Sequence, residues 1–300
     1  MTTNTKEGSE TNAKIGFKRV LFATDFSTAS ENAFGYASSI TRRYHADLYV
    51  AHVINLEPVD LIAPGLAASA LDGMREQARK KIESMLATRG IPPERYHITV
   101  GEGTVAECLT DLLRQNDIDV CVLGTHGRRA FKKLILGSIA EEVFRVASCP
   151  VLTVGPQNPA PDAATELRHI LYPVEFAPDS SQAASYAVSL AERYGAKLTL
   201  LHVSEDMPAS QNQDSPVTMP VESWIDDHVS RESSLRRRIR FERGFGSATK
   251  AILDFASDAQ VDVIVIGIRP FDPVIAAHLP KADTAYELVS RAPCPVLTVR

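Results

Sequence analysis

The chain has 300 residues, of which 44% are hydrophobic and 23% are charged, and its formal net charge is −5. This length suits two globular domains, and the negative charge argues against a broad nucleic-acid-binding surface. No segment stays apolar for the roughly 18 residues that a membrane-spanning helix needs, and the four cysteines form no CxxC pair. We therefore expect a cytoplasmic protein with reduced thiols and no membrane partner.

The first part of the chain predicts alternating strands and helices. Residues 1–15 are polar, lack the apolar core of a signal peptide, and are interpreted as a mobile tail. The segment VLFATDF predicts a buried strand ending in the carboxylate of Asp25, followed by a helix that Thr28 or Ser30 could cap. Further strands are predicted at 46–53, 96–100 and 119–123, with a helix at about 67–89 and another that Thr104 would cap.

A glycine-containing loop follows the strand at 119–123. It runs GTHGRRAFKKLILGS from Gly124 to Ser138 and contains four cationic side chains. Glycines allow the backbone to approach an anion, and the free N–H groups of the helix that Ser138 opens favour phosphate. A strand, a glycine loop and a helix in this order indicate a phosphate site, although turn glycines and solvated cations are the plainer interpretation. The loop is neither a Walker A motif nor GxGxxG.

The spacing Gly124-x2-Gly127-x9-Gly137-Ser138 resembles the nucleotide loop of the ATP-binding branch of the universal stress protein family, and so does the closing strand PVLTV. The resemblance implies a Rossmann-like α/β fold, similar to the adenine nucleotide alpha hydrolases, and ATP as ligand, with or without Mg²⁺. It also implies the nucleotide-binding residues, which are Ala23, Thr24, Asp25, Val53, Gly124, His126, Gly127, Arg128, Gly137, Ser138 and Ile139.

The resemblance gives these residues separate roles. The carboxylate of Asp25 would lie near the nucleoside, the backbone of Val53 would meet adenine, and the glycine loop would take ribose and phosphates. A turn or helix-capping carboxylate is the alternative for Asp25, and a solvated loop histidine is the alternative for His126. We expect His126 to be a contact and assign no catalytic residue.

The order of elements then repeats, and its first part recurs at an offset of 150 residues. The segment from His169 to Val203 mirrors the segment from Arg19 to Val53, and CPVLTV occurs twice. An internal repeat of this length predicts two copies of one domain. We expect one domain at residues 16–156, a Pro- and Ala-rich linker at 157–166 and a second domain at 167–300, each with an open parallel five-stranded sheet and flanking helices.

The second copy departs from the motif at the glycine loop. Pro270 takes the position equivalent to Gly127, Ala282 and Asp283 stand opposite Gly137 and Ser138, and Glu175 replaces Asp25. Proline removes an N–H group, and a carboxylate at the helix start repels phosphate. We expect no ATP site in this copy, which leaves a structural role or a site for another ligand.

Paired positions also predict contacts between the copies. The apolar last strands, Val151 to Val154 and Val296 to Val299, should pair across an intramolecular pseudo-dimer, and a homodimer through the helical faces stays open. The equivalent strand histidines, His52 and His202, are interpreted as hydrogen-bonded core or edge residues, because they lie among apolar neighbours.

Three functions remain open from the sequence. The first is a nucleotide-dependent stress-response protein with ATP as its ligand. The second is an enzyme, a nucleotide hydrolase or an adenylyl transferase, that uses Asp25 and His126, whereas slow ATP hydrolysis is compatible with the first. The third is an interaction scaffold with a vestigial nucleotide site and an unknown protein partner. No clear general base accompanies the loop, so the first is favoured.

Overall fold

The computed structural model describes residues 15–54, 64–125, 138–158, 167–175, 181–204, 218–268 and 284–300. Residues 1–14 of the predicted tail and residues 159–166 of the predicted linker lie outside these ranges. So do residues 126–137 and 269–283, which precede the fourth helix of each copy.

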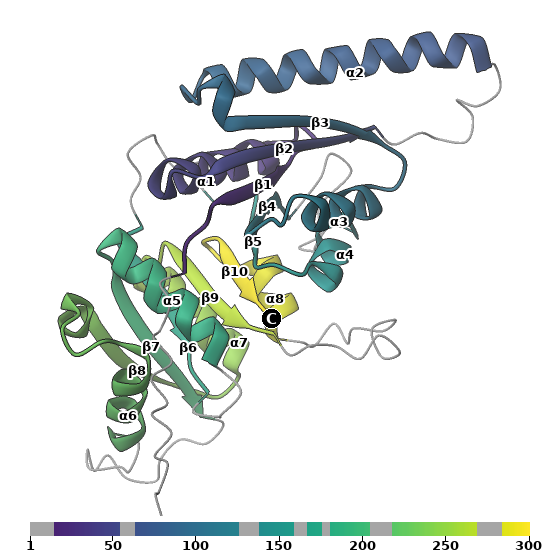
Figure 1. The fold of residues 1–300 in the computed structure, drawn as a ribbon. Helices are drawn as coiled ribbons and strands as arrows, with labels where there is room; N and C mark the ends of the chain where they lie inside the picture. The colour runs from purple at the N-terminus through teal and green to yellow at the C-terminus, as the bar shows by residue number, and fades with distance from the viewer. Residues whose placement is uncertain are drawn as a thin grey trace, which may run out of the picture.

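The predicted alternation of strands and helices is confirmed in both copies (Figure 1). In the first copy the elements are β1 (Arg19–Ala23), α1 (Thr28–Tyr44), β2 (Asp47–Ile54), α2 (Pro64–Ala87), β3 (Tyr96–Glu102), α3 (Val105–Gln115), β4 (Val120–Gly124), α4 (Ser138–Val146) and β5 (Val151–Val154). In the second copy they are β6 (His169–Pro173), α5 (Ser181–Tyr194), β7 (Lys197–Ser204), α6 (Thr218–His228), β8 (Ile239–Phe245), α7 (Ala248–Asp258), β9 (Val263–Gly267), α8 (Thr284–Arg291) and β10 (Val296–Val299). Short 3₁₀ helices, η2 (Pro93–Arg95) and η4 (Ser234–Arg238), precede β3 and β8.

The helix caps differ in detail from the prediction. Ser27, and neither Thr28 nor Ser30, caps α1: its side chain accepts the backbone N–H of Ser30 at 3.3 Å. Ser27 has the extended conformation that a capping residue needs, with φ −81° and ψ 163°. Thr104 does precede α3, but its side chain makes no capping hydrogen bond.

The two predicted five-stranded sheets are joined into one ten-stranded sheet, in the order β3-β2-β1-β4-β5-β10-β9-β6-β7-β8. The join is the expected pairing of the last strands, β5 with β10, and this pair is antiparallel whereas the strand pairs within each copy are parallel. Leu152 lies opposite Leu297 at the centre of the join. The buried hydroxyl groups of Thr153 and Thr298 each donate to a carbonyl of the opposite strand at 3.1 Å.

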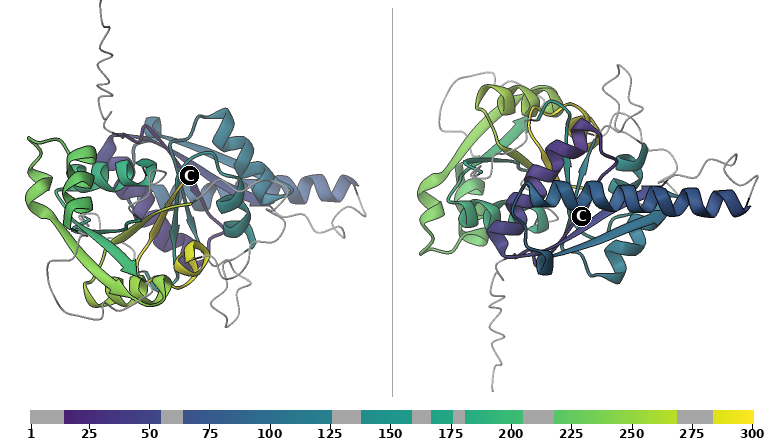
Figure 2. Two further views of the ribbon diagram at one scale, coloured as in Figure 1. Left: turned by 90° about the horizontal axis from the view of Figure 1, so that it is seen from below. Right: turned by 90° about the horizontal axis from the view of Figure 1, so that it is seen from above.

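Helices cover both faces of the sheet, as Figure 2 shows. One core lies under α1, α2, α5 and α6, and the other lies under α3, α4, α7 and α8. Successive strand residues alternate between the two: Val20 and Phe22 belong to the first core and Leu21 to the second, and all three are fully buried. This two-sided burial explains why the strands are continuous apolar runs in the sequence.

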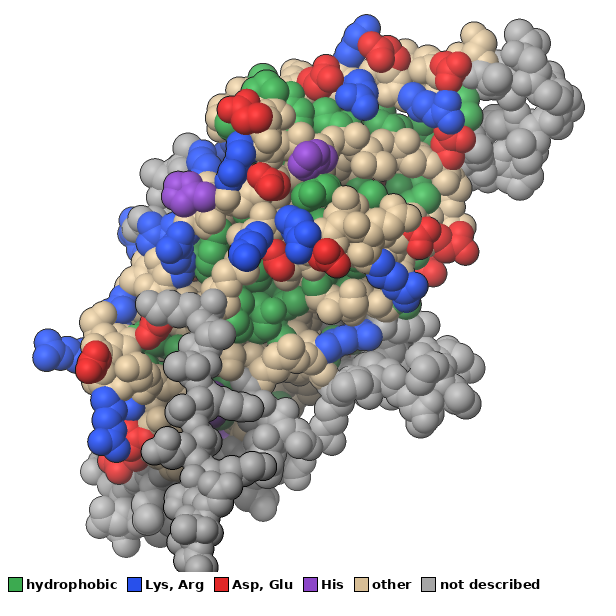
Figure 3. Space-filling model, in the orientation of Figure 1, with side chains coloured by type: hydrophobic (Ala, Val, Ile, Leu, Met, Phe, Trp, Pro, Cys, Tyr) green, Lys and Arg blue, Asp and Glu red, His purple; other side chains and the backbone are tan. Residues whose placement is uncertain are grey.

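The outer surface of α2 is polar. Figure 3 shows acidic and basic side chains mixed along this helix. Two pairs lie four residues apart on it, Lys80 with Glu76 at 3.2 Å and Arg79 with Glu83 at 3.9 Å. Such exposed pairs contribute little to stability, so the helix is held by its buried residues Ile82 and Leu86.

The C-terminal ends of α1 and α5 meet across the join in a reciprocal contact. The guanidinium of Arg43 donates to the carbonyl of Arg193 at 3.0 Å and lies 5.2 Å from the centre of the Tyr194 ring. The guanidinium of Arg193 donates to the carbonyl of Arg43 at 2.6 Å and lies 5.1 Å from the centre of the Tyr44 ring. Each arginine thus satisfies a carbonyl at the end of the opposite helix.

Cutting the chain inside residues 159–166 should therefore leave the two copies associated. An engineered protease site in this segment gives the cut, and a sizing column gives the result. We expect the cut protein to elute with the intact chain, because the β5–β10 pairing and the arginine contacts do not depend on the linker. Elution as two separate halves would show that the join is weaker than its buried contacts indicate.

The cysteines are free thiols, as expected from the absence of CxxC pairs. Cys121 and Cys294 are buried, and Cys108 and Cys149 are partly buried. Burial raises the pKa of both Cys149 and Cys294 to about 12, so these two stay protonated and unreactive near neutral pH. In the part of the chain that the structure describes, no helix combines the length and apolar character of a membrane span.

Candidate functional site

The predicted site residues that the structure describes lie where the sheet changes its winding direction. β1 lies between β2 and β4, with Ala23 opposite Ala51 on one side and Leu123 on the other. The helix after β1 packs in the first core, whereas the helix after β4 packs in the second. The carboxyl ends of β1 and β4 therefore flank a topological switch point, where open α/β sheets bind ligands.

A tight turn connects β1 to α1 at this edge. The backbone N–H of Phe26 donates to Thr24 Oγ1 at 3.0 Å, and the N–H of Ser27 donates to Asp25 Oδ1, also at 3.0 Å. Phe26 has a positive φ of 60°, which these side-chain acceptors support. The hydroxyl groups of Thr24 and Ser30 lie 3.1 Å apart, so the turn is tied to the first turn of α1.

Asp25 therefore has the structural role of a turn carboxylate, which is the alternative that the sequence left open. One carboxylate oxygen holds the turn through Ser27, and the side chain is partly exposed at the carboxyl edge of the sheet. These two properties are compatible with ligand binding, because a carboxylate has acceptor positions on both oxygens.

The histidine interpretation is confirmed. Nδ1 of His52 lies 2.8 Å from the carbonyl of Thr24, and Nδ1 of His202 lies 3.1 Å from the carbonyl of Val174. A carbonyl only accepts, so Nδ1 carries the proton in both rings. His52 also packs against Phe26 of the β1–α1 turn, with 4.6 Å between the ring centres.

Gly124 has a packing role that the sequence interpretation missed. A Cβ atom here would lie 2.8 Å from the carbonyl carbon of Ala29 and 2.9 Å from the backbone nitrogen of Ser30. The end of β4 thus touches the backbone at the start of α1, and only glycine allows this distance. At the equivalent Gly267, a Cβ atom would lie 3.4 Å from Ala183 Cβ, an ordinary contact.

Two further predicted elements border the same edge. Val53 lies opposite Gly101 near the end of the β2–β3 pair. α4 begins at Ser138, followed by Ile139, as the motif predicted. The predicted residues His126, Gly127, Arg128 and Gly137 lie outside the described residues.

Cys108 is a neighbour of this edge that the motif did not indicate. Its thiol donates to the carbonyl of Glu102 at 3.3 Å. A Cβ atom on Gly101 would lie 3.4 Å from its sulfur and 3.8 Å from Val53 Cγ2. Only the three-dimensional pairing of β2, β3 and α3 brings these residues together, so no local sequence signal marks it.

The described arrangement suits a polar ligand with an anionic end. The β1–α1 turn offers a carboxylate and backbone groups, and the start of α4 offers N–H donors with a partial positive charge. Within the described ranges, no group of three or more His, Cys, Asp or Glu side chains is positioned to hold a metal ion.

The corresponding edge of the second copy is built differently. Glu175 takes the position of Asp25, and a Cβ atom on Gly267 would lie 3.4 Å from Ala183 Cβ. Residues 179 and 180, which correspond to Ala29 and Ser30, lie outside the described residues. Pro270, Ala282 and Asp283, on which the predicted loss of the second site depends, lie outside the described residues.

Comparison with known proteins finds that two segments of this chain match the same family. The model of the universal stress protein family matches residues 16–155 and again residues 166–300. Universal stress protein MJ0531 of Methanocaldococcus jannaschii is 31% identical over 142 residues, which are 46% of this chain and 82% of that protein. Universal stress protein A homolog 1 of Coxiella burnetii is 32% identical over 142 residues, 46% of this chain and 96% of that protein. The crystal structure of a universal stress protein from Archaeoglobus fulgidus has the same fold: it covers 95% of this chain and 99% of its own, with TM-score 0.73 and 19% identity.

Proposed function

This chain belongs to the universal stress protein family, and we propose that it is a nucleotide-dependent stress-response protein that binds ATP at one site, in the domain formed by residues 16–156. The observation that carries the proposal is the order of elements at the switch point. β4 ends at Gly124 and α4 begins at Ser138, so the glycine spacing of the motif connects the end of a buried strand to the start of a helix.

Three groups of residues divide the ligand between them in this proposal. Asp25 and the backbone near Ala23, Thr24 and Val53 take the nucleoside. Gly124, His126, Gly127 and Arg128 take ribose and phosphates from the loop. Gly137, Ser138 and Ile139 supply N–H donors at the start of α4, where the helix dipole favours phosphate.

Binding, rather than turnover, is the proposed activity. Asp25 accepts a hydrogen bond from the backbone N–H of Ser27. We assign none of the described histidines or carboxylates as the general base that would activate water for hydrolysis. Mg²⁺ would arrive with the nucleotide phosphates, because the described side chains form no metal cluster of their own. A turnover assay that finds hydrolysis well above the rate in buffer would favour the enzyme instead.

The substitution Asp25→Asn tests the proposed nucleoside contact. The amide oxygen of asparagine still accepts the N–H of Ser27, so the turn is kept, but the charge and the second acceptor are lost. We expect ATP binding to weaken by about 1–3 kcal/mol, the usual cost of losing a charged hydrogen bond. Calorimetric titration measures it, with thermal unfolding to verify that stability is unchanged.

Glu175→Gln is the matched control, because it makes the same change at the equivalent position of the second copy. It should leave ATP affinity unaltered. Inorganic triphosphate should bind the parent protein more weakly than ATP, since it lacks the nucleoside. Equal affinity for triphosphate and ATP would contradict the role of Asp25, and no measurable ATP binding would favour the scaffold function.

A further inference from the structure

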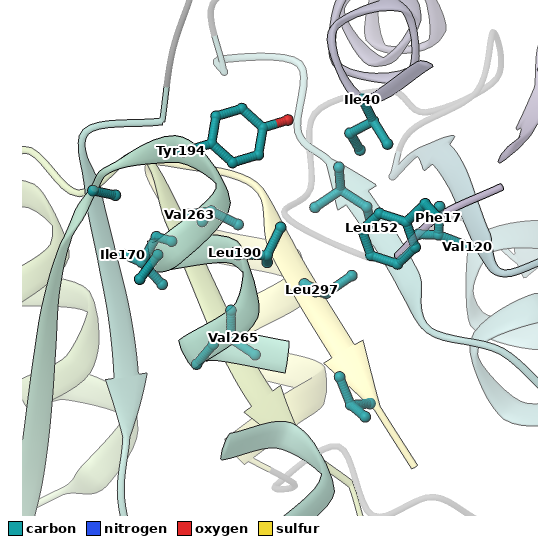
Figure 4. Close-up of a cluster of buried hydrophobic side chains, with 14 of the residues drawn as sticks. Phe17, Ile40, Val120, Leu152, Ile170, Leu190, Tyr194, Val263, Val265 and Leu297 are labelled. Carbon is teal, nitrogen blue, oxygen red and sulfur yellow. The ribbon is translucent and has the colours of Figure 1, made fainter. Parts of the chain in front are cut away.

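In the part of the chain that the structure describes, the ten-stranded sheet has two outer edges, β3 and β8. The inner edge of each half is paired at the join, where Figure 4 shows Leu152 of β5 and Leu297 of β10 among buried hydrophobic side chains from both copies. An outer strand presents a row of backbone N–H and C=O groups with no neighbouring strand, so it is a place where a further strand can pair.

The two outer edges differ in what covers them. Helix α2 has 24 residues and runs along β3 (Figure 1), and an ion pair between Arg75 and Glu102 ties it to the end of that strand. The corresponding helix of the second copy, α6, has 11 residues. Of the seven residues of β3, only His97 is exposed. Four of the seven residues of β8 are exposed, and these are Arg240, Glu242, Arg243 and Phe245.

The pairing of β8 with β7 determines which backbone groups of β8 point outward. The N–H of Gly246 donates to the carbonyl of Ser204 at 2.9 Å, and Ser204 lies opposite Phe245. Alternate residues of a strand direct their backbone groups to opposite sides, so the even-numbered residues of β8 bond to β7 and the odd-numbered residues face away from it. The outward-facing residues are Ile239, Phe241, Arg243 and Phe245.

The side chains of β8 are self-complementary in one antiparallel register. If two β8 strands pair about a twofold axis at Phe241, Arg240 of each chain lies opposite Glu242 of the other. Phe241 faces outward, so the two Phe241 residues exchange backbone hydrogen bonds, and the Arg240–Glu242 pairs take the closer, non-hydrogen-bonded positions. An axis at residue 239, 240, 242 or 243 would instead place two arginines or two glutamates opposite each other.

The same register satisfies the outward backbone groups near the ends of the pair. In the single chain, the guanidinium of Arg240 donates to the carbonyls of Arg237 at 3.1 Å and Ile239 at 2.8 Å. When Arg240 turns to Glu242 of a second chain, the N–H of Arg243 of that chain takes its place at the carbonyl of Ile239. The N–H of Ile239 keeps its own acceptor, the carbonyl of Leu235.

We propose that β8 is a dimerisation edge, and that its partner is β8 of a second chain, antiparallel about a twofold axis at Phe241. The ten-stranded sheets of two chains then form one continuous sheet. A single pair of strands makes a small interface, so the association depends on concentration. The proposed nucleotide site lies between β1 and β4 in the other half of the sheet, so the dimer does not depend on ATP binding.

Sedimentation velocity of the full-length protein over a range of concentrations tests this proposal. The parent protein should show an equilibrium between monomer and dimer. Glu242→Arg places two arginines opposite each other, and Arg240→Glu places two glutamates opposite each other. Each variant should therefore dimerise at least about tenfold more weakly than the parent. Glu94→Arg is the control, because it reverses a charge just before β3, at the other outer edge, and should leave dimerisation unchanged.

A mixture of Glu242→Arg and Arg240→Glu gives the sharper test. One chain then carries arginine at both positions and the other carries glutamate at both, so unlike chains are complementary and the mixture should regain dimers that neither variant forms alone. Charged side chains on an outer strand also serve to prevent pairing, and a parent protein that stays monomeric at every concentration would show that role and overturn the proposal. A dimer that neither variant weakens would place the interface elsewhere, for example on the helical faces, and would overturn it too. Circular dichroism verifies that both variants are folded.

Discussion

Calorimetric titration of the full chain with ATP is expected to give one nucleotide per chain, although the chain contains two copies of the domain. Sequence alignment puts Asp283 where the first copy has Ser138, at the start of the helix that would face phosphate. Two like charges about 4 Å apart repel by about 4 kcal/mol at an intermediate dielectric. That is close to a thousandfold in affinity, enough to remove a micromolar site. Pro270 removes a further N–H donor from the same loop.

Two substitutions separate the copies in this experiment. Gly137→Val should abolish ATP binding, because a branched side chain would occupy phosphate space at the start of α4 while the buried strands stay intact. Asp283→Ser should leave ATP binding at the site of the first copy unchanged. The titration needs to be run with and without Mg²⁺, since a cation could bridge Asp283 to phosphate. Two equivalent sites per chain in either condition would show that the second loop is competent.

Local sequence pattern was enough to predict the order of elements. Buried parallel strands are short apolar runs with polar or glycine boundaries, and the run from Val120 to Leu123 between Asp119 and Gly124 is a clear example. The repeat then predicted the second copy, because the segment from Arg19 to Val53 recurs 150 residues later and CPVLTV recurs at the end of the chain. The pairing of β5 with β10 was also predictable, since an apolar strand at the end of its sheet needs a partner.

Contacts between distant segments were not predictable in the same way. The cap of α1 is Ser27 because the Asp25 turn sets its conformation, and this depends on the geometry of the turn rather than on residue type. The packing of Phe17 between Tyr44 of α1 and Tyr186 of α5 appears only when the two helices are brought together at the join.

Gly124 illustrates the same limit, and it leads to the second large expected effect. Its place in the motif suggested a phosphate contact, whereas the structure adds a close approach to the α1 backbone at Ala29 and Ser30. Gly124→Ala should therefore lower the free energy of unfolding by about 1–3 kcal/mol, the usual cost of forcing an extra carbon into a packed region. Backbone atoms cannot rotate away as a flexible side chain can, so the start of α1 has to move.

Gly267→Ala makes the same substitution at the equivalent strand end of the second copy, where, among the described residues, the new Cβ atom meets Ala183 Cβ at 3.4 Å. This variant should unfold within about 0.5 kcal/mol of the parent, as surface substitutions usually do. Urea unfolding followed by circular dichroism gives both values under one condition. The only tryptophan, Trp224 in α6, reports on the second copy by fluorescence, so an early transition seen by dichroism alone would locate the damage in the first copy. Equal loss of stability in the two variants would mean that the close approach of Gly124 to the α1 backbone is not the cause of the loss.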